Sequence, residues 1–199
     1  MRFCDETEWG FGWLQADRLA RCSHALRAES RVWIFDPVDS PGVEERIRSL
    51  GEPAGVIQLL DRHRRDSAAL AERLDVPLHE TPFDGVPGAP FDPVPIVRQR
   101  FWREVALWWP EGQVLLCGDA LGTVGYFVAP GELLGVHPLL RLVPPRTLSR
   151  FAPCHVLCGH GEGIHGGAAA PALEEALATA RRRLPAVWRY GWRQAKGGR

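Results

Sequence analysis

The sequence predicts an α/β (α+β) protein, and three observations carry that prediction. In the first third, two short apolar runs are each followed by a helical pattern, an order typical of α/β proteins. In the middle third, two apolar runs flank the turn residues 110–112, which indicates an antiparallel hairpin. In the last third, a short strand precedes the most regular amphipathic helix of the chain, at 168–184.

The composition bounds the class of protein. The chain has 199 residues, 45% hydrophobic and 24% charged, so one domain over 1–199 is expected, with a core at 11–184. Because 24 basic residues balance 24 acidic ones, the overall charge favours neither nucleic acid nor an anionic membrane. No apolar stretch approaches the roughly 20 residues that cross a bilayer. The amino terminus lacks the apolar core of a signal peptide, and the five cysteines form no even-numbered framework. We therefore expect a cytoplasmic protein with reduced thiols.

The first predicted elements alternate between strand and helix. Residues 11–35 alternate weakly and end in a strand at 32–35, after which Asp36 opens a turn. Residues 43–50 follow as a short helix. A second buried strand at 56–60 comes next, with a helix at 67–74 behind it.

The later elements are interrupted by two irregular regions. Residues 77–95 hold six of the 17 prolines and are predicted as a long loop. Strands are expected at 94–97, 104–109 and 113–117, and then an apolar, glycine-broken segment at 121–145 has no clear pattern. A last strand at 154–158 runs into a glycine-rich turn before the helix at 168–184, and a basic aromatic tail at 185–199 closes the chain.

Charged residues follow directly on the second buried strand. Positions 61–66 combine the carboxylates of Asp61 and Asp66, the imidazole of His63 and three guanidinium groups. The carboxyl end of a buried strand is where α/β proteins place their chemistry. Such a segment is either a ligand cage or a set of salt bridges. The residues by themselves leave both interpretations open.

The order of these features resembles the metallo-β-lactamase superfamily. The resemblance rests on the charged segment between a strand and a helix, on EVALWWPEGQVLLCGDAL at 104–121, on HVLCGHG at 155–161, and on the final amphipathic helix. It covers about residues 32–184. It implies a four-layer αββα sandwich, in which two mixed sheets lie between outer helices.

The resemblance also implies a set of metal-site positions. Members of the superfamily bind one or two metal ions through an His-x-His-x-Asp-His motif and three later ligands. The matching positions in this chain are Asp61, His63, Arg65, Asp66, Arg100, Asp119 and His160. Only His63, Asp119 and His160 keep the residue type of the superfamily. The metal motif is therefore degraded.

Two functional interpretations follow from these substitutions. Arginine cannot bind a metal ion because it stays protonated and offers only donors. In the first interpretation, Arg65 and Arg100 pair with the three carboxylates, and metal-dependent hydrolysis is weak or lost. In the alternative, one divalent metal, most readily zinc, still hydrolyses a small ester, thioester or phosphoester. Its candidate ligands are Asp61, His63, Asp66, Asp119 and His160, with Asp61 or Asp66 as ligand or general base.

A third class is binding without catalysis. Arg65, Arg100 and Arg103 could line a pocket for a small anionic ligand. The basic aromatic tail at 181–199 is a weak candidate for single-stranded nucleic acid or a membrane surface.

Simpler structural roles compete with these functions. Asp66 directly precedes a helix and could serve as its N-cap, and Asp119 follows a glycine and could stabilise a turn. Arg62 and Arg64 alternate with the ligand positions, so we expect them to face solvent.

Overall fold

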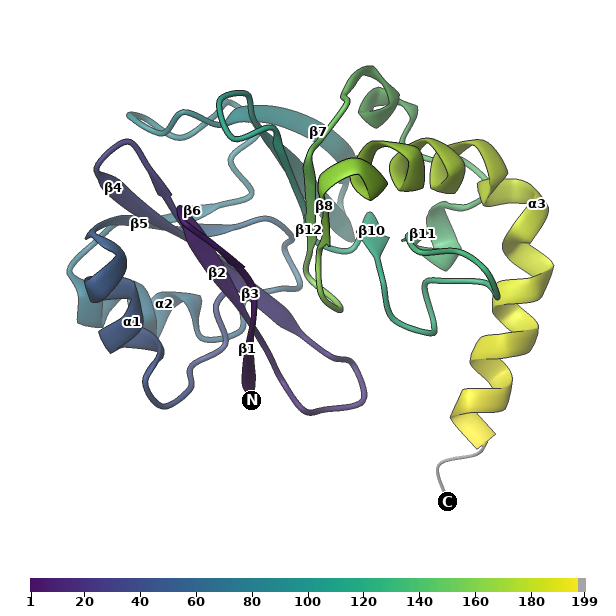
Figure 1. The fold of residues 1–199 in the computed structure, drawn as a ribbon, viewed down its shortest axis with the longest axis horizontal. Coiled ribbons are helices and arrows are strands. Elements are labelled where there is room, and N and C mark those ends of the chain that lie inside the picture. The colour runs from purple at the N-terminus through teal and green to yellow at the C-terminus, as the bar shows by residue number, and fades with distance from the viewer. Residues whose placement is uncertain (197–199) are drawn as a thin grey trace.

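Two β-sheets lie face to face in the centre of the molecule, with helices on both outer sides (Figure 1). The computed structural model describes residues 1–196, with side chains described as far as Arg189. Helices α1 (Val43–Leu50) and α2 (Ser67–Leu74) cover one sheet, and α3 (Ala169–Lys196) covers the other. This is the four-layer αββα arrangement that the resemblance implied.

The first sheet has six strands in the order β1-β2-β3-β4-β5-β6. Its first four strands pair antiparallel, whereas β4, β5 and β6 pair parallel, so the sheet is mixed. The strands are β1 (Arg2–Thr7), β2 (Gly10–Leu14), β3 (Cys22–Ala28), β4 (Arg31–Phe35), β5 (Glu52–Gln58) and β6 (Leu78–Glu80).

The second sheet has five strands in the order β13-β12-β9-β8-β7. The pair β9 and β12 is parallel and the other pairs are antiparallel, so this sheet is mixed as well. The short strands β10 (Leu121–Gly122) and β11 (Gly135–Val136) form a separate pair. The five strands are β7 (Asp92–Gln99), β8 (Trp102–Trp109), β9 (Val114–Cys117), β12 (His155–Cys158) and β13 (Ile164–His165).

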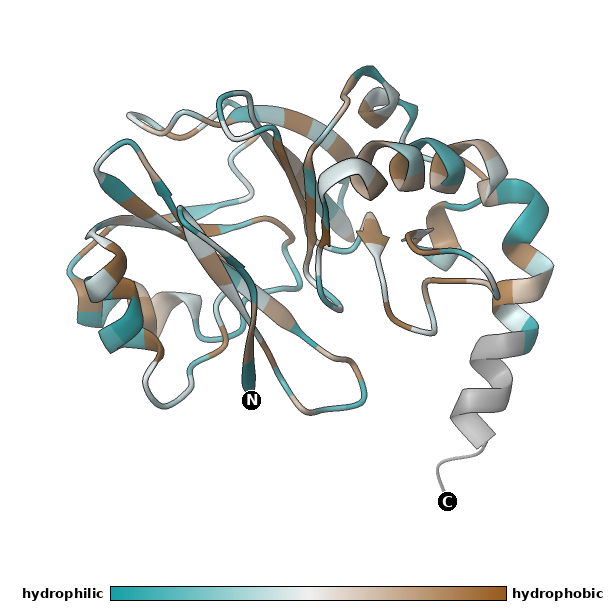
Figure 2. Ribbon diagram, in the orientation of Figure 1, coloured by the Kyte–Doolittle hydropathy of each residue, from teal (hydrophilic) through white to brown (hydrophobic). Residues whose placement is uncertain are grey.

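Three buried apolar clusters separate the four layers. Ile34 and Leu70 belong to the cluster beneath α1 and α2, whereas Trp33 and Leu107 belong to the cluster between the sheets. Neighbouring residues such as Trp33 and Ile34 point to opposite faces because side chains alternate along a strand. Leu173 of α3 belongs to the third cluster, on the far face of the second sheet. Figure 2 shows apolar stretches in strands of both sheets, and helices that carry both apolar and polar residues.

Most predicted elements have counterparts close to their predicted bounds. Both α1 and α2 begin and end where the sequence placed them, and β8 pairs antiparallel with β9 across the predicted turn. The region 77–95 is shorter as a loop than predicted, since it contains β6 and the start of β7. The strand β6 has three residues and none of them is fully buried, so it carries no apolar pattern that the sequence could reveal.

Helix α3 extends beyond the predicted helix and absorbs most of the tail. Pro185 lies inside it, where a proline removes one intrahelical hydrogen bond, and Figure 1 shows that α3 changes direction along its length. Trp188 is 58% exposed, while the side chains of 190–199, part of the proposed nucleic-acid segment, lie outside the described residues. Among the described residues, no helix has the length and apolar character that crossing a membrane requires. The cytoplasmic location and the single domain stay predictions.

Candidate metal centre

Three side chains from distant parts of the chain converge at one end of the two sheets. His63 follows β5, Asp119 follows β9 and His160 follows β12. The distance from Asp119 Oδ1 is 3.0 Å to His63 Nε2 and 3.2 Å to His160 Nε2, and the two nitrogens are 3.3 Å apart. These three donor atoms form a nearly equilateral triangle, which is a group that could hold a metal ion.

Hydrogen bonds at Nδ1 fix the orientation of both imidazole rings. His63 Nδ1 lies 2.8 Å from Asp36 Oδ2, and His160 Nδ1 lies 2.7 Å from the carbonyl oxygen of Leu19. Carboxylate and carbonyl oxygens only accept, so each Nδ1 carries the proton. In its neutral form each ring therefore presents the lone pair of Nε2 to the centre of the triangle, as metal-binding histidines do.

The centre of the triangle attracts positive charge. Burial and the nearby Arg65 lower the pKa of His63, but Asp36 and Asp119 outweigh them and raise it above its ordinary value. Burial raises the pKa of Asp119, yet hydrogen bonds with His160 and His63, and then the charges of these rings, hold that pKa well below its usual range. When both rings are neutral, three acceptors face one another, and buried Asp119 Oδ1 has no hydrogen-bond partner among the described residues. A cation between them, either a proton or a metal ion, relieves that repulsion.

A cavity of about 390 Å³ opens beside the triangle. Arg62 lies at this cavity, with its guanidinium 4.3 Å from the centre of the Trp102 ring and 3.4 Å from Asp119 Oδ2. We expected Arg62 to face away from the ligand positions; it is 45% exposed but contacts one of them. The other side chains at the cavity are Leu19, Arg21, Arg65, Tyr126 and His137.

His137 contributes a neutral donor to this cavity. Its Nδ1 accepts a hydrogen bond of 3.2 Å from the backbone N–H of Leu139, so the ring proton is on Nε2. Burial lowers the pKa of His137 to about 4, so the ring stays uncharged at neutral pH.

Arg65 is half-buried and bonds to backbone carbonyls, not to carboxylates. Its guanidinium donates to the carbonyl oxygens of Cys22, Asp36 and Gly159 at 2.6, 2.7 and 2.9 Å. Arg65 thus connects the first sheet with the turn that carries His160. The pairing of Arg65 with carboxylates that we predicted is therefore replaced by a clamp on the backbone.

Asp61 and Asp66 lie outside the triangle. The backbone N–H of Asp61 donates to Arg103, and its Oδ1 is buried without a hydrogen-bond partner among the described residues. Asp66 stands at the N-cap position of α2, but its carboxylate accepts from the backbone N–H of Asp39 at 2.8 Å and makes no capping bond. The turn that starts α2 directs this side chain toward the loop after β4.

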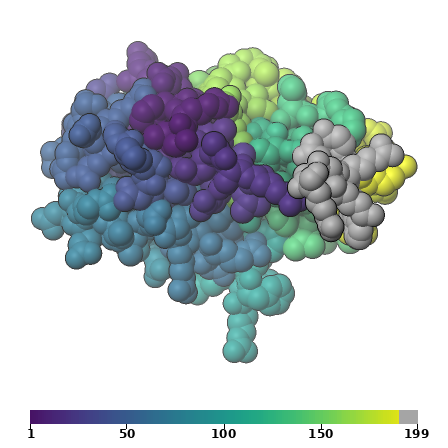
Figure 3. All heavy atoms as spheres, turned by 90° about the horizontal axis from the view of Figure 1, so that it is seen from below, coloured from purple at the N-terminus to yellow at the C-terminus, as the bar shows by residue number. Residues whose placement is uncertain are grey.

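Arg100 and Arg103 do not reach the triangle's cavity. They line a different cavity of about 280 Å³, together with Phe83, Arg98 and Gln99. The strands β7 and β8 extend to Gln99 and Trp102, so Arg100 lies in the exposed turn between them. In Figure 3, atoms in the teal of this part of the sequence protrude from the molecular surface. The match of Arg100 to a metal-ligand position relied on counting residues back from Glu104. The match fails because the sequence does not reveal how far the β7–β8 hairpin extends.

Glu104 supports the turn that carries Asp119. It is fully buried, and its carboxylate accepts from Trp102 Nε1 at 2.9 Å and from the backbone N–H of Ala120 at 2.6 Å. Burial, and secondarily the charge of Asp119, raises the pKa of Glu104 from 4.5 to about 7. Glu104 therefore releases its proton at a higher pH in the folded chain than in the unfolded chain.

The raised pKa of Glu104 predicts that the stability of the folded chain depends on pH, and that Glu104→Gln removes this dependence. Between pH 4.5 and about 7 the folded state holds a proton that the unfolded state has lost, so the free energy of unfolding falls as pH rises. The full effect is about 3 kcal/mol. We expect the free energy of unfolding of Glu104→Gln, relative to that of the parent chain, to rise by that amount as the pH increases from 4.5 to 8. Urea unfolding at both pH values measures it, and parallel profiles for the two proteins would contradict it.

Several residues at the centre were not assigned a role from the sequence. Asp36 directly follows β4, the parallel neighbour of β5, so the shared sheet edge was a signal that Asp36 and His63 would meet. Leu19, Tyr126 and His137 come from loops without a periodic pattern, and the sequence carries no comparable signal for them.

Comparisons with known proteins bear on the fold. No protein-family model matches the sequence, and no curated protein matches it. Among solved structures, the chain is similar to the metallo-β-lactamase DIM-1, from a crystal exposed to ceftazidime, with a TM-score of 0.61 and 14% identity over 90% of this chain and 97% of that one. It is also similar to TMB-1, with a TM-score of 0.59 and 11% identity over 92% and 96% of the two chains. A third similar structure is TTHA1623 in a di-iron-bound form, with a TM-score of 0.53 and 21% identity over 77% and 94%.

Proposed function

We propose that this chain, whose fold is that of the metallo-β-lactamases, is a hydrolase that uses a single divalent metal ion. His63, Asp119 and His160 would hold the ion, and zinc or iron fits this set of two nitrogens and one oxygen. A metal bound there would polarise the substrate and lower the pKa of a bound water.

The observation that carries the proposal is the triangle of donor atoms. Its edges of 3.0, 3.2 and 3.3 Å are close to the roughly 3.3 Å between nitrogen and oxygen ligands of a tetrahedral zinc ion. Both rings have their Nδ1 protons engaged, so the lone pairs that a metal needs are already directed inward. The geometry thus favours the single-metal alternative over the loss of metal chemistry.

Arg65 explains why we propose one metal ion and not two. Its position matches a ligand of the superfamily motif, and its guanidinium is buried among carbonyl oxygens beside the triangle. A permanent cation at that place opposes a second metal ion by repulsion and offers it no lone pair.

The cavity residues would bind and orient the substrate. Arg62 offers a charged donor at the rim, which suits a carboxylate or phosphate group. His137 offers an uncharged N–H for a carbonyl or phosphoryl oxygen. Asp119 Oδ2, on the only carboxylate among the described residues that line the cavity, would accept a proton from the attacking water. We therefore propose a small anionic ester, thioester or phosphoester as the substrate.

Metal removal tests this function. The purified chain is analysed for bound metal and assayed with a neutral nitrophenyl ester, a carboxylate-bearing ester, a thioester and a nitrophenyl phosphodiester. We expect hydrolysis of at least one anionic substrate, its loss after treatment with a chelator, and its return when zinc or iron is added back.

The same measurement identifies the competing interpretation. A chain that holds no metal in the triangle, that hydrolyses none of these substrates and whose melting temperature is indifferent to zinc would have lost the chemistry of its fold. In that case a proton takes the place of the metal between His63, Asp119 and His160.

A further inference from the structure

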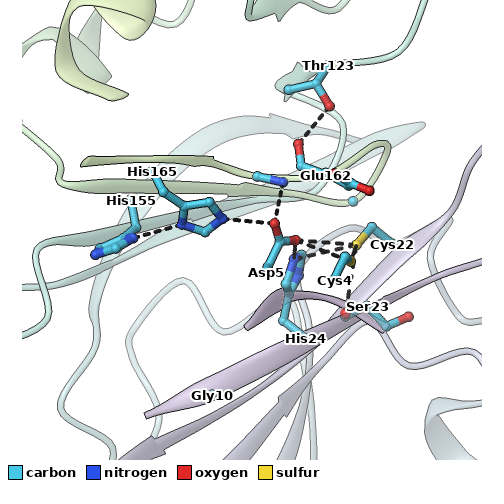
Figure 4. Close-up of polar contacts among 12 residues, drawn as sticks. Cys4, Asp5, Gly10, Cys22, Ser23, His24, Thr123, His155, Glu162 and His165 are labelled. Carbon is cyan, nitrogen blue, oxygen red and sulfur yellow. Dashed lines mark hydrogen bonds and ion pairs between the residues drawn. The ribbon is translucent and has the colours of Figure 1, made fainter. Parts of the chain in front are cut away.

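A second group of side chains that could hold a metal ion, Cys4, Asp5 and Cys22, lies between the first sheet and β13 (Figure 4). Cys4 Sγ lies 3.7 Å from Cys22 Sγ and 3.5 Å from Asp5 Oδ2, and Cys22 Sγ lies 3.9 Å from the same oxygen. His24 Nε2 lies 3.5 Å from Cys22 Sγ and 3.1 Å from Asp5 Oδ2. We call these four residues the thiolate cluster.

The donor atoms of Cys4, Asp5 and Cys22 all lie within 4.8 Å of one another, and His24 Nε2 lies within 3.5 Å of two of them; these distances are close to those around a bound metal ion. In a tetrahedral zinc site, ligand atoms are separated by about 3.8 Å for two sulfurs, about 3.5 Å for sulfur and nitrogen or oxygen, and about 3.3 Å for nitrogen and oxygen. We propose that Cys4, Asp5, Cys22 and His24 form a structural site for one divalent metal ion that favours thiolate ligands, in the first place zinc.

The backbone leaves room for these atoms at Gly12. Gly12 is paired with Cys4 on one side and with His24 on the other, so the three residues form a row across β1, β2 and β3. A Cβ atom on Gly12 would lie 3.0 Å from Cys4 Sγ, 3.0 Å from Asp5 Oδ2 and 3.0 Å from His24 Cδ2. Because Gly12 has no side chain, the ligand atoms from β1 and β3 can approach one another.

Strained backbone directs Asp5 into the thiolate cluster. Consecutive side chains of a regular strand point to opposite faces, so Cys4 and Asp5 would not normally meet. Here the register of β1 shifts between Cys4 and Thr7, and Asp5 has a φ of 50°. A non-glycine residue in the left-handed region is strained, and such strain is found preferentially at ligand sites.

Two other roles for these residues fit less well. A disulfide would have to join β1 to β3 across β2, a separation of about 9–10 Å between strands, whereas disulfides need Cα atoms within about 7 Å. In a Cys-His-Asp catalytic triad, cysteine and aspartate bond to different ring nitrogens. Here both Cys22 Sγ and Asp5 Oδ2 approach Nε2 of His24, which is the arrangement of ligands that share one ion.

The thiolate cluster is connected to the turn that carries His160. Asp5 Oδ1 accepts from the backbone N–H of Gly163 at 2.8 Å and lies 2.9 Å from His165 Nε2. The backbone N–H of Cys22 donates to Gly159 at 2.9 Å. These bonds hold both ends of the segment 159–163, so an ion bound by the thiolate cluster would anchor the amino-terminal strand to that segment.

Cobalt substitution tests the second site without relying on activity. The full chain is kept reduced, stripped of metal with a chelator and titrated with Co²⁺, which gives a near-ultraviolet charge-transfer band only when thiolates bind it. Because the triangle also takes up one ion, we expect this band to saturate by two equivalents of Co²⁺ and to disappear when zinc is added. Because the triangle of His63, Asp119 and His160 contains no sulfur, it cannot produce this band.

Variants assign the band to the thiolate cluster. We expect Cys22→Ser to abolish it by removing a ligand, and Gly12→Ala to abolish it by filling the space while leaving all four ligands present. Cys154→Ser, which changes a thiol outside the cluster, is the matched control and keeps the band, as does Asp119→Asn.

The titration of the parent chain remains decisive even if a variant fails to fold. Absence of the band from the reduced parent chain overturns the proposal, as does a band that survives both Cys22→Ser and Gly12→Ala. Loss of activity with the band intact would instead count against the proposed hydrolase alone, so failures of the two centres are distinguishable.

Discussion

Asp119→Asn is expected to empty the candidate metal centre and to abolish metal-dependent hydrolysis. Asp119 supplies the only anionic donor of the triangle, and its Oδ1 lies 3.0 Å and 3.2 Å from the two imidazole nitrogens. Asparagine keeps the shape of the side chain but loses the charge that favours a dication. Because loss of a residue that merely orients a ligand costs about 10–100-fold, we expect loss of a ligand to cost more than about 100-fold in kcat/KM. Metal content per chain and kcat/KM measure both effects.

Asp61→Asn is the informative control for this prediction. Asp61 belongs to the ligand set that the sequence suggested, but it is absent from the group of donor atoms that converge. We expect its variant to retain the metal ion and the activity. Equal loss of metal from both variants would show that Asp61 is a ligand and that the triangle is not the complete centre.

Arg65→Met is expected to destabilise the folded chain severely. The guanidinium donates to three backbone carbonyl oxygens that belong to different segments, and methionine keeps the length of the side chain but no donor. Each buried polar group left without a partner costs about 1–3 kcal/mol, so the free energy of unfolding should fall by about 3–5 kcal/mol. Urea unfolding in the presence of a chelator measures this change separately from metal binding.

Arg64→Met provides the matched comparison. Arg64 is the preceding residue and is exposed, so its replacement should change the free energy of unfolding by no more than about 0.5 kcal/mol. A similar response of the two variants would mean that the buried guanidinium does not hold the sheet and the turn of His160 together.

The two arginines at motif positions show how one residue type can have unrelated roles. Arg65 follows a buried strand and is enclosed by Cys22, Asp36 and Gly159 because three segments meet there. Arg100 lies in the exposed turn of a long hairpin. The resemblance matched both to metal-ligand positions, but only Arg65 lies near the candidate metal centre, so only Arg65 can influence what that centre binds.

From the sequence alone, the layered α/β architecture, helices α1 and α2 and the three ligand candidates His63, Asp119 and His160 could be inferred. Apolar periodicity marked the two helices, whereas the layered arrangement and the three ligand candidates followed from the resemblance to the metallo-β-lactamase superfamily. Tertiary structure alone decided that Asp61, Asp66 and Arg100 lie apart from the centre, and that His137 reaches it. It also brought Cys4 and Cys22 together across an intervening strand at Gly12. The physical reason is that side-chain convergence depends on strand register, bulges and loop paths, which are determined by packing between distant segments and leave no periodic trace in the chain.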